Sequence, residues 1–310
     1  MKKTILLVFC ALTAGVVAHA DLKVGLMPAY NSIPLVVAHA GGFFVARGVR
    51  VELVPFSSQL NRETALQTHA IDGTVSDLIN AIQAWAHGFE VRVTSASEGD
   101  FALLSAPGSP LATMADVSRS NAPLRTGLLE NSIVYYVTER MFESARIDPG
   151  RIDLVPIVAL PARLQMLLAG KIEAACLPEP LATMASARGA HRLATTADMG
   201  TPGVILFTRK ALAEKSEEIS RFYRAYDEAV EEVTRNGESY RSAIIQGCEF
   251  PPAVKDLMQI PRFRASFAPP AAQVSDVARW MREKRLIEAE PRYDDIVASG
   301  FAAHGGAQPQ

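Results

Sequence analysis

The sequence predicts an α/β protein built from two similar lobes. Short apolar strands alternate with amphipathic helices, and glycines or capping residues separate them. Residues 21–56 read as strand, helix and strand, which is the length of one βαβ unit. The alternation restarts from Gly108, and about 290 residues follow residue 20, more than one core usually holds. We therefore expect two lobes with a cleft between them.

Residues 1–20 have the pattern of a secretory signal peptide. Lys2 and Lys3 precede an uncharged apolar run, and small residues lead to Ala20. No later stretch approaches the roughly 20 apolar residues that a membrane anchor needs. We expect cleavage after Ala20 and a soluble exported product. A lipid anchor on Cys10 is the less favoured alternative, because the bulky Phe9 precedes that cysteine and the apolar run continues beyond it.

The first lobe is expected to comprise residues 21–105 and 204–301. Its strands are predicted at residues 21–28, 49–56, 71–77 and 89–97, and residues 101–107 extend this sheet or begin a crossover. Residues 201–210 look like a strand that returns to the first lobe, and residues 211–235 form a long amphipathic helix. Residues 302–310 read as a disordered tail.

The second lobe is expected over residues 106–203. Strands at 123–130, 151–158 and 171–177 alternate with helices at 133–144 and 161–170. The lobes would be joined by crossing segments near residues 104–108 and 198–203.

Composition excludes some classes of partner. The chain is 49% hydrophobic and 21% charged, with a formal net charge of −2, which is typical of a globular protein and does not indicate nucleic-acid binding. Cys176 and Cys248 are too few for a disulfide framework and are expected to be small core residues. Whether they form a single bridge is left open, since sequence does not give the distance between them.

Candidate ligand contacts follow from the turns between strands and helices. In open α/β sheets, ligands bind at the carboxyl ends of strands, beside the N-termini of the next helices. The candidates are Tyr30, Asn31, Ser32, Ser57, Ser58, Ser76, Asp77, Glu130, Asn131, Ser132, Arg163 and Glu179. Each has a structural alternative. The serines at 32, 58 and 132 and Asp77 are good helix caps, whereas Arg163 occupies a first helical turn, where the helix dipole does not favour a cation.

No catalytic pattern is present. The sequence lacks a Gly-x-Ser-x-Gly elbow, a phosphate-binding loop and an HExxH motif, and its histidines lack metal-ligand spacing. We predict no enzyme activity, no cofactor and no metal. An enzyme would need a proton-transfer pair, and the only candidates are carboxylates whose proximity the sequence does not give.

Three stretches in order carry a family resemblance. They read "GLMPAYNSIPLVVAHAGGFFVARGVRVELVPF", "ALQTHAIDGTVSDLINAI" and "LPARLQMLLAGKIEAACLPEPLAT". The chain resembles solute-binding proteins of ABC importers, in the branch of the sulfonate, nitrate, taurine and thiamine-pyrimidine receptors. The resemblance implies a type II periplasmic-binding-protein fold that closes on a small molecule by a hinge motion. The implied partners are a permease and its ATPase, with the protein a monomer. Related pyrimidine-synthesising enzymes carry a cysteine-rich motif that this chain lacks, which favours binding.

The candidate residues suggest a ligand class. Asp77, Glu130 and Glu179 would suit an amine or an aminopyrimidine, with Tyr30 stacking on its face. We therefore expect a nitrogenous ligand. Ser58, Ser132 and Arg163 could instead bind a sulfonate or nitrate, and a sensory protein that acts on a membrane kinase would use the same fold.

Glu179 lies between two prolines after a buried strand, where a carboxylate also suits the start of the next helix. The resemblance implies that it points into the cleft. On that basis, Glu179→Gln should weaken binding of an amine while leaving the melting temperature of the empty protein nearly unchanged.

Overall fold

The computed structural model describes residues 20–197 and 199–302. Residues 1–19 of the predicted signal peptide, with Cys10 among them, and residues 303–310 of the tail predicted over 302–310 lie outside the described residues. Among the described helices, none is both long and apolar enough to cross a bilayer.

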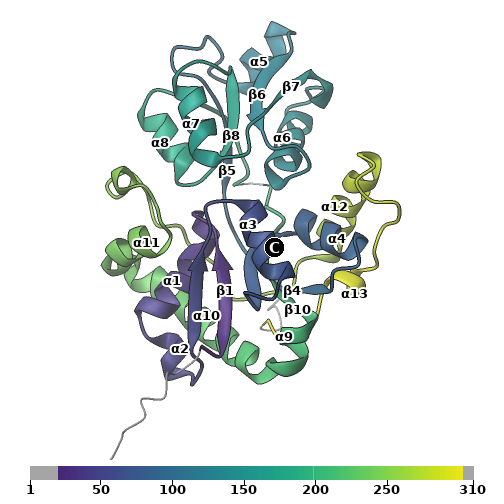
Figure 1. Cartoon of the computed structure of the whole chain (residues 1–310). Coiled ribbons are helices and arrows are strands. Elements are labelled where there is room, and N and C mark those ends of the chain that lie inside the picture. The colour runs from purple at the N-terminus through teal and green to yellow at the C-terminus, as the bar shows by residue number, and fades with distance from the viewer. Residues whose placement is uncertain (1–19, 198, 303–310) are drawn as a thin grey trace, which may run out of the picture.

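Two five-stranded sheets form the two lobes, one above the other in Figure 1. The lobe 1 sheet has the order β2-β1-β3-β10-β4, and the lobe 2 sheet has the order β7-β6-β8-β5-β9. In each sheet four strands run in the same direction, and the fifth is antiparallel to both of its neighbours. This fifth strand is β10 in lobe 1 and β5 in lobe 2, and each comes directly after the chain has crossed from the other lobe. The predicted two-lobed α/β architecture is confirmed.

The strands are short and mostly buried. Those of lobe 1 are β1 (Leu22–Leu26), β2 (Val51–Pro55), β3 (Gly73–Asp77), β4 (Val91–Ala96) and β10 (Gly203–Thr208). Those of lobe 2 are β5 (Phe101–Ser105), β6 (Leu124–Leu128), β7 (Ile152–Pro156), β8 (Ala174–Pro178) and β9 (His191–Thr195). Strands β3, β8 and β10 are buried along their whole length, because helices cover both faces of the sheets at these positions.

Helices connect these strands. In the first part of lobe 1 they are η1 (Tyr30–Ser32), α1 (Ile33–Ala40), α2 (Phe43–Ala46), α3 (Gln59–Gln67) and α4 (Leu78–Ala86). Lobe 2 contains α5 (Met114–Ser120), α6 (Ile133–Ser144), η2 (Pro149–Arg151), α7 (Leu160–Leu168) and α8 (Leu181–Ala187). The C-terminal part contains α9 (Arg209–Glu214), α10 (Ser216–Asn236), η3 (Gly237–Tyr240), α11 (Arg241–Gly247), η4 (Pro252–Val254), α12 (Ala271–Glu283) and α13 (Tyr293–Ile296).

The first crossing between the lobes lies earlier than expected. Strand β5, which the predicted boundary at residue 105 assigns to lobe 1, pairs antiparallel with β8 and β9 of lobe 2. The chain therefore crosses over residues 97–100, between β4 and β5, rather than near 104–108. Strand β5 was assigned to the wrong lobe because the apolar pattern of a strand does not indicate which sheet it joins. The return strand β10 does pair with β3 and β4 of lobe 1, as predicted.

The predicted long helix over residues 211–235 is two helices. Helix α9 ends before Lys215, whose φ of −132° is not helical, and α10 begins at Ser216. The ammonium group of Lys215 binds Asp72 at 2.8 Å. The helix break thus coincides with an ion pair to the loop before β3, a contact that helical periodicity cannot reveal.

Candidate functional site

A cavity of about 250 Å³ lies between the two lobes. From lobe 1, it is lined by the segments that follow β1, β2 and β3, and from lobe 2 by those that follow β6, β7 and β8. These are the carboxyl ends of the parallel strands, where ligands bind in open α/β sheets.

Seven of the predicted residues line this cavity. They are Asn31, Ser57, Ser58, Ser76, Asp77, Ser132 and Arg163. The other five are not among the lining residues, and they are Tyr30, Ser32, Glu130, Asn131 and Glu179. The structure therefore brings together four of the five predicted serines, Asn31 and the predicted cation, but only one of the three predicted carboxylates.

Tyr30 and Ser32 are buried beside the cavity instead of facing it. Tyr30 is 6% exposed and packs against Phe250, with the ring centroids 6.2 Å apart. Burial raises the pKa of Tyr30, and the nearby Glu179 raises this pKa further. Ser32 is fully buried, and its hydroxyl donates to the carbonyl of Met27 at 2.7 Å. Both side chains stabilise the turn after β1.

Glu179 is occupied within its own lobe. One carboxylate oxygen accepts a hydrogen bond from Arg192 at 2.5 Å, and the other accepts from the backbone N–H of Thr183 at 3.0 Å. Thr183 lies in the first turn of α8, so Glu179 caps that helix. Glu130 is exposed, and Asn131 has a left-handed φ of 57° in the loop before α6.

Arg163 is the most deeply buried cation of the cavity. It is 1% exposed, and its two terminal nitrogens donate to the carbonyls of Cys176 and Ile157 at 3.1 and 2.7 Å. Its Nε has no hydrogen-bond partner, and no carboxylate of the described residues forms an ion pair with it. Burial lowers the pKa of Arg163 to about 10, so the group remains charged at neutral pH. The cavity therefore contains a positive charge without a counter-ion.

A glycine leaves room for this arginine. A Cβ on Gly127 of β6 would lie 3.4 Å from Cγ of Arg163 and 2.5 Å from the side chain of Ile172. A larger residue would displace Ile172 and crowd the arginine stem. An alanine at this position would therefore press on Ile172 while only touching the stem of Arg163.

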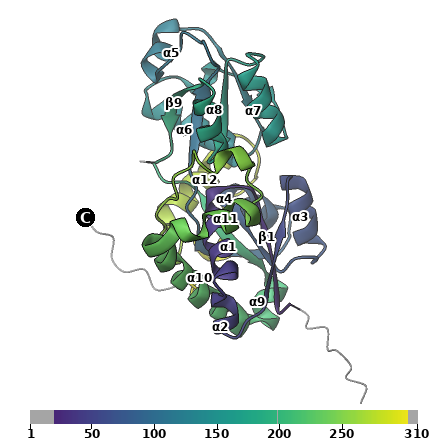
Figure 2. The same cartoon turned by 90° about the vertical axis from the view of Figure 1, so that its left-hand side faces the viewer.

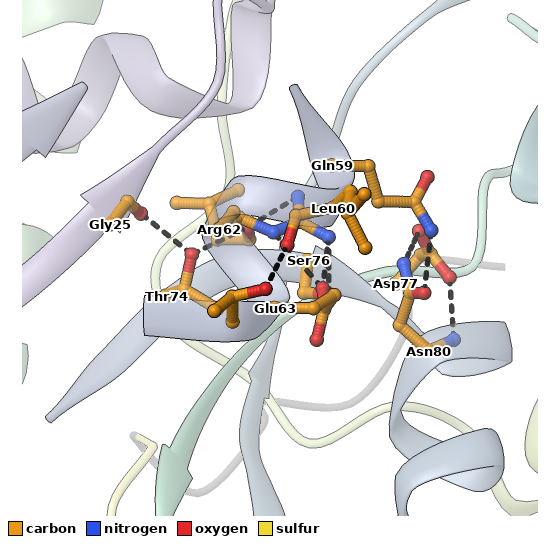
Figure 3. A network of polar contacts seen from close by, with 11 residues as sticks. Gly25, Gln59, Leu60, Arg62, Glu63, Thr74, Ser76, Asp77 and Asn80 are labelled. Carbon is orange, nitrogen blue, oxygen red and sulfur yellow. Dashed lines mark hydrogen bonds and ion pairs between the residues drawn. The ribbon is translucent and has the colours of Figure 1, made fainter. Parts of the chain in front are cut away.

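Arg62 is a second buried arginine that sequence reasoning missed. It is 5% exposed and donates to the carbonyl of Val75 at 3.2 Å and to the hydroxyl of Ser76 at 3.1 Å (Figure 3). Unlike Arg163, it forms an ion pair with Glu63 at 2.6 Å. The position of Arg62 in its helix could have identified it as a candidate, because it is the fourth residue of α3, just as Arg163 is the fourth residue of α7.

Asp77 provides the only acidic side chain in the lining. It caps α4 by accepting hydrogen bonds from the backbone N–H and the side-chain amide of Asn80 at 2.9 and 2.8 Å. Gln59 in turn donates to the side-chain oxygen of Asn80 at 2.7 Å (Figure 3). Burial raises the pKa of Asp77 from 3.8 to about 6, an effect that the nearby Arg62 opposes. The carboxylate is thus held in place by groups of its own lobe.

None of the three predicted serine caps forms a capping hydrogen bond, and Ser32, at the N-cap of α1, donates to the carbonyl of Met27 instead. Ser58 and Ser132 occupy the N-cap positions of α3 and α6, but neither side chain accepts a hydrogen bond from its helix. The hydroxyl of Ser132 donates instead to the carbonyl of Leu129 at 2.5 Å. The N-cap of α7 is Ala159, which has no side-chain acceptor. Three helix N-termini at the cavity therefore lack a side-chain cap, and such N-termini favour anions.

The remaining wall is apolar. It is formed chiefly by Met27, Phe101, Leu129, Ile133, Val134, Val158, Leu160 and Pro178. Most of these residues belong to lobe 2, so the uncapped α6 and α7 N-termini and Arg163 are set in an apolar surround. Such a site suits a ligand with a charged group and a carbon-containing body.

A metal centre is not supported. Within residues 20–197 and 199–302, no group of three or more His, Cys, Asp or Glu residues is placed to hold a metal ion. Cys176 and Cys248 are buried free thiols.

Comparisons with known proteins agree with this geometry. The model of the NMT1-like family matches residues 17–246. Compared with curated protein sequences, the chain shows no match. Among solved structures, it is similar to the periplasmic aliphatic sulphonate binding protein SsuA of Escherichia coli, with 18% identity, a TM-score of 0.73, and coverage of 90% of this chain and 98% of that one.

Two further structures have the same fold. The alkanesulfonate-binding protein SsuA of Xanthomonas axonopodis pv. citri, bound to MOPS, is 19% identical with a TM-score of 0.72, and the match covers 93% of this chain and 99% of that chain. The periplasmic nitrate-binding protein NrtA of Synechocystis PCC 6803 is 12% identical with a TM-score of 0.71, over 88% of this chain and 83% of that chain. The chain therefore has the periplasmic-binding-protein fold that its sequence predicts.

Proposed function

Because the chain belongs to the NMT1-like family, we propose that it is the extracytoplasmic solute-binding component of an ABC importer, and that its ligand is a small organic acid. The protein would bind this ligand between its lobes and deliver it to a permease with its ATPase. Solved structures of the same fold include sulfonate- and nitrate-binding proteins, which supports the transport class.

The single observation that carries the ligand class is the buried Arg163. Arg163 has two carbonyl acceptors but forms no ion pair with a carboxylate of the described residues. A buried charge without a counter-ion is costly, and an anionic ligand would supply one. The uncapped N-termini of α6 and α7 lie in the same wall. An acid group at this place would accept charge-assisted hydrogen bonds from side-chain and backbone donors.

The nitrogenous ligand expected from the sequence becomes the second candidate. That expectation depended on three carboxylates, of which only Asp77 lines the cavity. Asp77 and the unpartnered side-chain oxygen of Asn31 are acceptors that a ligand amine would suit. An aminopyrimidine or amine would therefore bind on the lobe 1 side of the cavity.

Size limits the ligand as well. A cavity of about 250 Å³ lies just below the 300–1,000 Å³ typical of drug-sized ligands. The apolar wall makes a bare inorganic anion a poorer fit than an acid with a short hydrocarbon or aromatic body. We propose binding rather than turnover, because the ionisable side chains of the lining, Arg62, Asp77 and Arg163, include no nucleophile with an adjacent base.

The test is a thermal-shift and calorimetry panel on the purified protein from residue 21 onward. The panel contains short-chain and aromatic carboxylates, alkyl sulfonates, nitrate, simple amines and aminopyrimidines. Organic acids are expected to raise the melting temperature, because a ligand at 100 times its Kd stabilises the native state by about 2.7 kcal/mol. A panel in which only the amines or pyrimidines bind would replace the organic acid by the second candidate. A bound compound recovered chemically changed would count against a pure binding function.

The partner is tested separately from the ligand. Transport predicts that deleting the gene for the protein abolishes uptake of the bound acid, whereas a sensory protein would leave uptake intact and abolish a transcriptional response. We further propose that the protein acts as a monomer, which light scattering of the purified protein would check.

A further inference from the structure

Helix α12 joins the two lobes on one flank of the molecule. It packs against α4 and α13 of lobe 1, and Gln273 near its start donates to the carbonyl of Thr201 at 3.0 Å. In Figure 2, α12 lies directly below α6 of lobe 2. The side chains of its C-terminal half contact that helix.

The contact between α12 and α6 is built around a buried carboxylate. Glu139 of α6 is 3% exposed and accepts hydrogen bonds from the indole N–H of Trp280 at 2.6 Å and from Lys284 at 2.5 Å. Trp280 is 2% exposed. Both donors belong to the C-terminal segment anchored on lobe 1, so separation of the helices would leave a buried carboxylate without these partners.

Aromatic and polar contacts extend this interface toward the solvent. Trp280 packs edge-on against Tyr136, with the ring centroids 5.3 Å apart and an interplanar angle of 82°. The hydroxyl of Tyr136 donates to Asp276 of α12 at 2.6 Å. Offset and edge-to-face aromatic pairs contribute beyond the area that they bury. We call the contacts of Glu139, Tyr136, Asp276, Trp280 and Lys284 the α6–α12 clasp.

The same helix that the clasp holds also forms the ligand cavity. Ser132, Ile133 and Val134, at the start of α6, line that cavity, and Glu139 lies about two turns further along. A helix of this length moves as one rigid unit. A movement of lobe 2 would therefore displace both the start of α6, which lines the ligand cavity, and Glu139, which belongs to the clasp.

Lobe 1 also contacts lobe 2 on the opposite flank. There η4 packs against α8, and Val254 belongs to the same apolar cluster as Leu181 and Met184. On the clasp side, Trp280 and Val277 share a second apolar cluster with Phe142. Lobe 2 is thus held from both sides by C-terminal segments of lobe 1, in addition to the two crossing segments of the chain.

From this arrangement we propose that the α6–α12 clasp fixes the orientation of lobe 2 in the ligand-free protein, and that hinge motion requires the clasp to slide or open. The clasp acts as a conformational device outside the ligand site. Its strength sets how far the lobes separate before any ligand is present. This inference concerns the empty protein and does not depend on the identity of the ligand.

The test measures the separation of the lobes directly. Leu60 in α3 and Gln165 in α7 are exposed, lie on opposite lobes and do not line the ligand cavity, so cysteines at these sites accept spin labels. The native Cys176 and Cys248 are buried and will not compete for label under native conditions. Pulsed electron paramagnetic resonance then gives the distribution of label distances in the ligand-free protein.

The clasp variant is Trp280→Phe combined with Tyr136→Phe, which keeps an aromatic ring at both positions, although a smaller one at 280, and removes the two hydrogen bonds that the native side chains donate. Arg282→Ala on the same helix is the matched control, because Arg282 pairs only with Glu290 among the described residues and is 63% exposed. The proposal expects a broadened distance distribution, or a second population, in the clasp variant and an unchanged distribution in the control.

An unchanged distribution in a folded clasp variant would overturn the proposal, as would an equal broadening in Arg282→Ala. If the double variant does not fold, Tyr136→Phe alone is used, since it removes only the hydrogen bond to Asp276 at the rim of the interface. A folded Tyr136→Phe protein with native distances would likewise overturn the proposal.

Discussion

Arg62 and Arg163 occupy equivalent positions in the two lobes. Each is the fourth residue of the helix that follows the edge strand of its sheet, and each donates to the carbonyl of the third residue of the central strand, Val75 or Cys176. They differ in charge pairing, because Arg62 is paired with Glu63 whereas Arg163 forms no ion pair with a carboxylate of the described residues. The two lobes thus share a buried arginine at the same place, and of these two only Arg163 forms no ion pair within the described part of the chain.

Arg163→Met should weaken binding of the best organic acid of the panel by roughly 10- to 100-fold, the loss expected for one charge-assisted hydrogen bond. The stability of the empty protein should change little, because the loss of an uncompensated buried charge offsets the two carbonyls left without donors. Calorimetry and urea unfolding measure the two quantities.

Arg62→Met is the matched control for that substitution. It leaves Glu63 without its partner, so it should lower the free energy of unfolding more than Arg163→Met does. Equal loss of acid binding in both variants, with equal loss of stability, would contradict a special role for Arg163.

Asp77 should make stability depend on pH in the mildly acidic range. Its pKa rises from 3.8 to about 6 on folding, so the native state binds more protons than the unfolded state between these values. The contribution of Asp77 to stability therefore falls as pH rises through this window, by at most about 1.4 kcal/mol per pH unit. The measurement is the difference in unfolding free energy between the wild type and Asp77→Asn, from about pH 4 to 7. The unfolding free energy of the wild type minus that of Asp77→Asn should fall as pH rises, and a rise in this quantity would contradict the prediction.

Glu179→Gln should destabilise the protein, contrary to what the sequence suggests. The substitution removes the charge that pairs with Arg192, while the amide oxygen can still accept from the N–H of Thr183. A loss of about 1–3 kcal/mol is expected for breaking a largely buried charged hydrogen bond. Ligand affinity should remain within a few-fold of the wild type. A stable variant with lost amine binding would instead restore Glu179 as a ligand contact.

Ser58→Ala should cost less than an ordinary N-cap substitution, which removes about 1 kcal/mol. The hydroxyl of Ser58 makes no capping hydrogen bond, so truncation removes no donor or acceptor pair. Thr113→Ala is the control, because Thr113 forms a complete capping box with Asp116 at the start of α5. Thermal unfolding should show a clearly larger loss for Thr113→Ala, and equal losses would mean that Ser58 has a structural role that this geometry does not explain.

Most elements of the fold could be predicted because they depend on local pattern. The alternation of apolar strands with glycine-terminated helices predicted nearly every strand, and the restart of that pattern predicted the second lobe. The assignment of β5 failed because the alternation does not say which sheet a strand joins.

The candidate site was predicted in part for the same reason. Turns at the ends of parallel strands can be found in the sequence, and Ser57, Ser76, Asp77 and Arg163 do line the cavity. The sequence could not show whether Glu179 faces the cavity, because its ion-pair partner Arg192 lies 13 residues away on the next strand.

By itself, the sequence determined the two-lobed α/β architecture and the edge of each sheet where a ligand would bind, since both follow from periodicity and strand order. Only the tertiary structure decided which charges at that edge are already neutralised. Glu63 pairs with Arg62 and Arg192 pairs with Glu179, whereas Arg163 has no such partner within residues 20–197 and 199–302. The physical reason is that pairing between charges depends on distances of a few ångströms between side chains, which chain order alone does not fix.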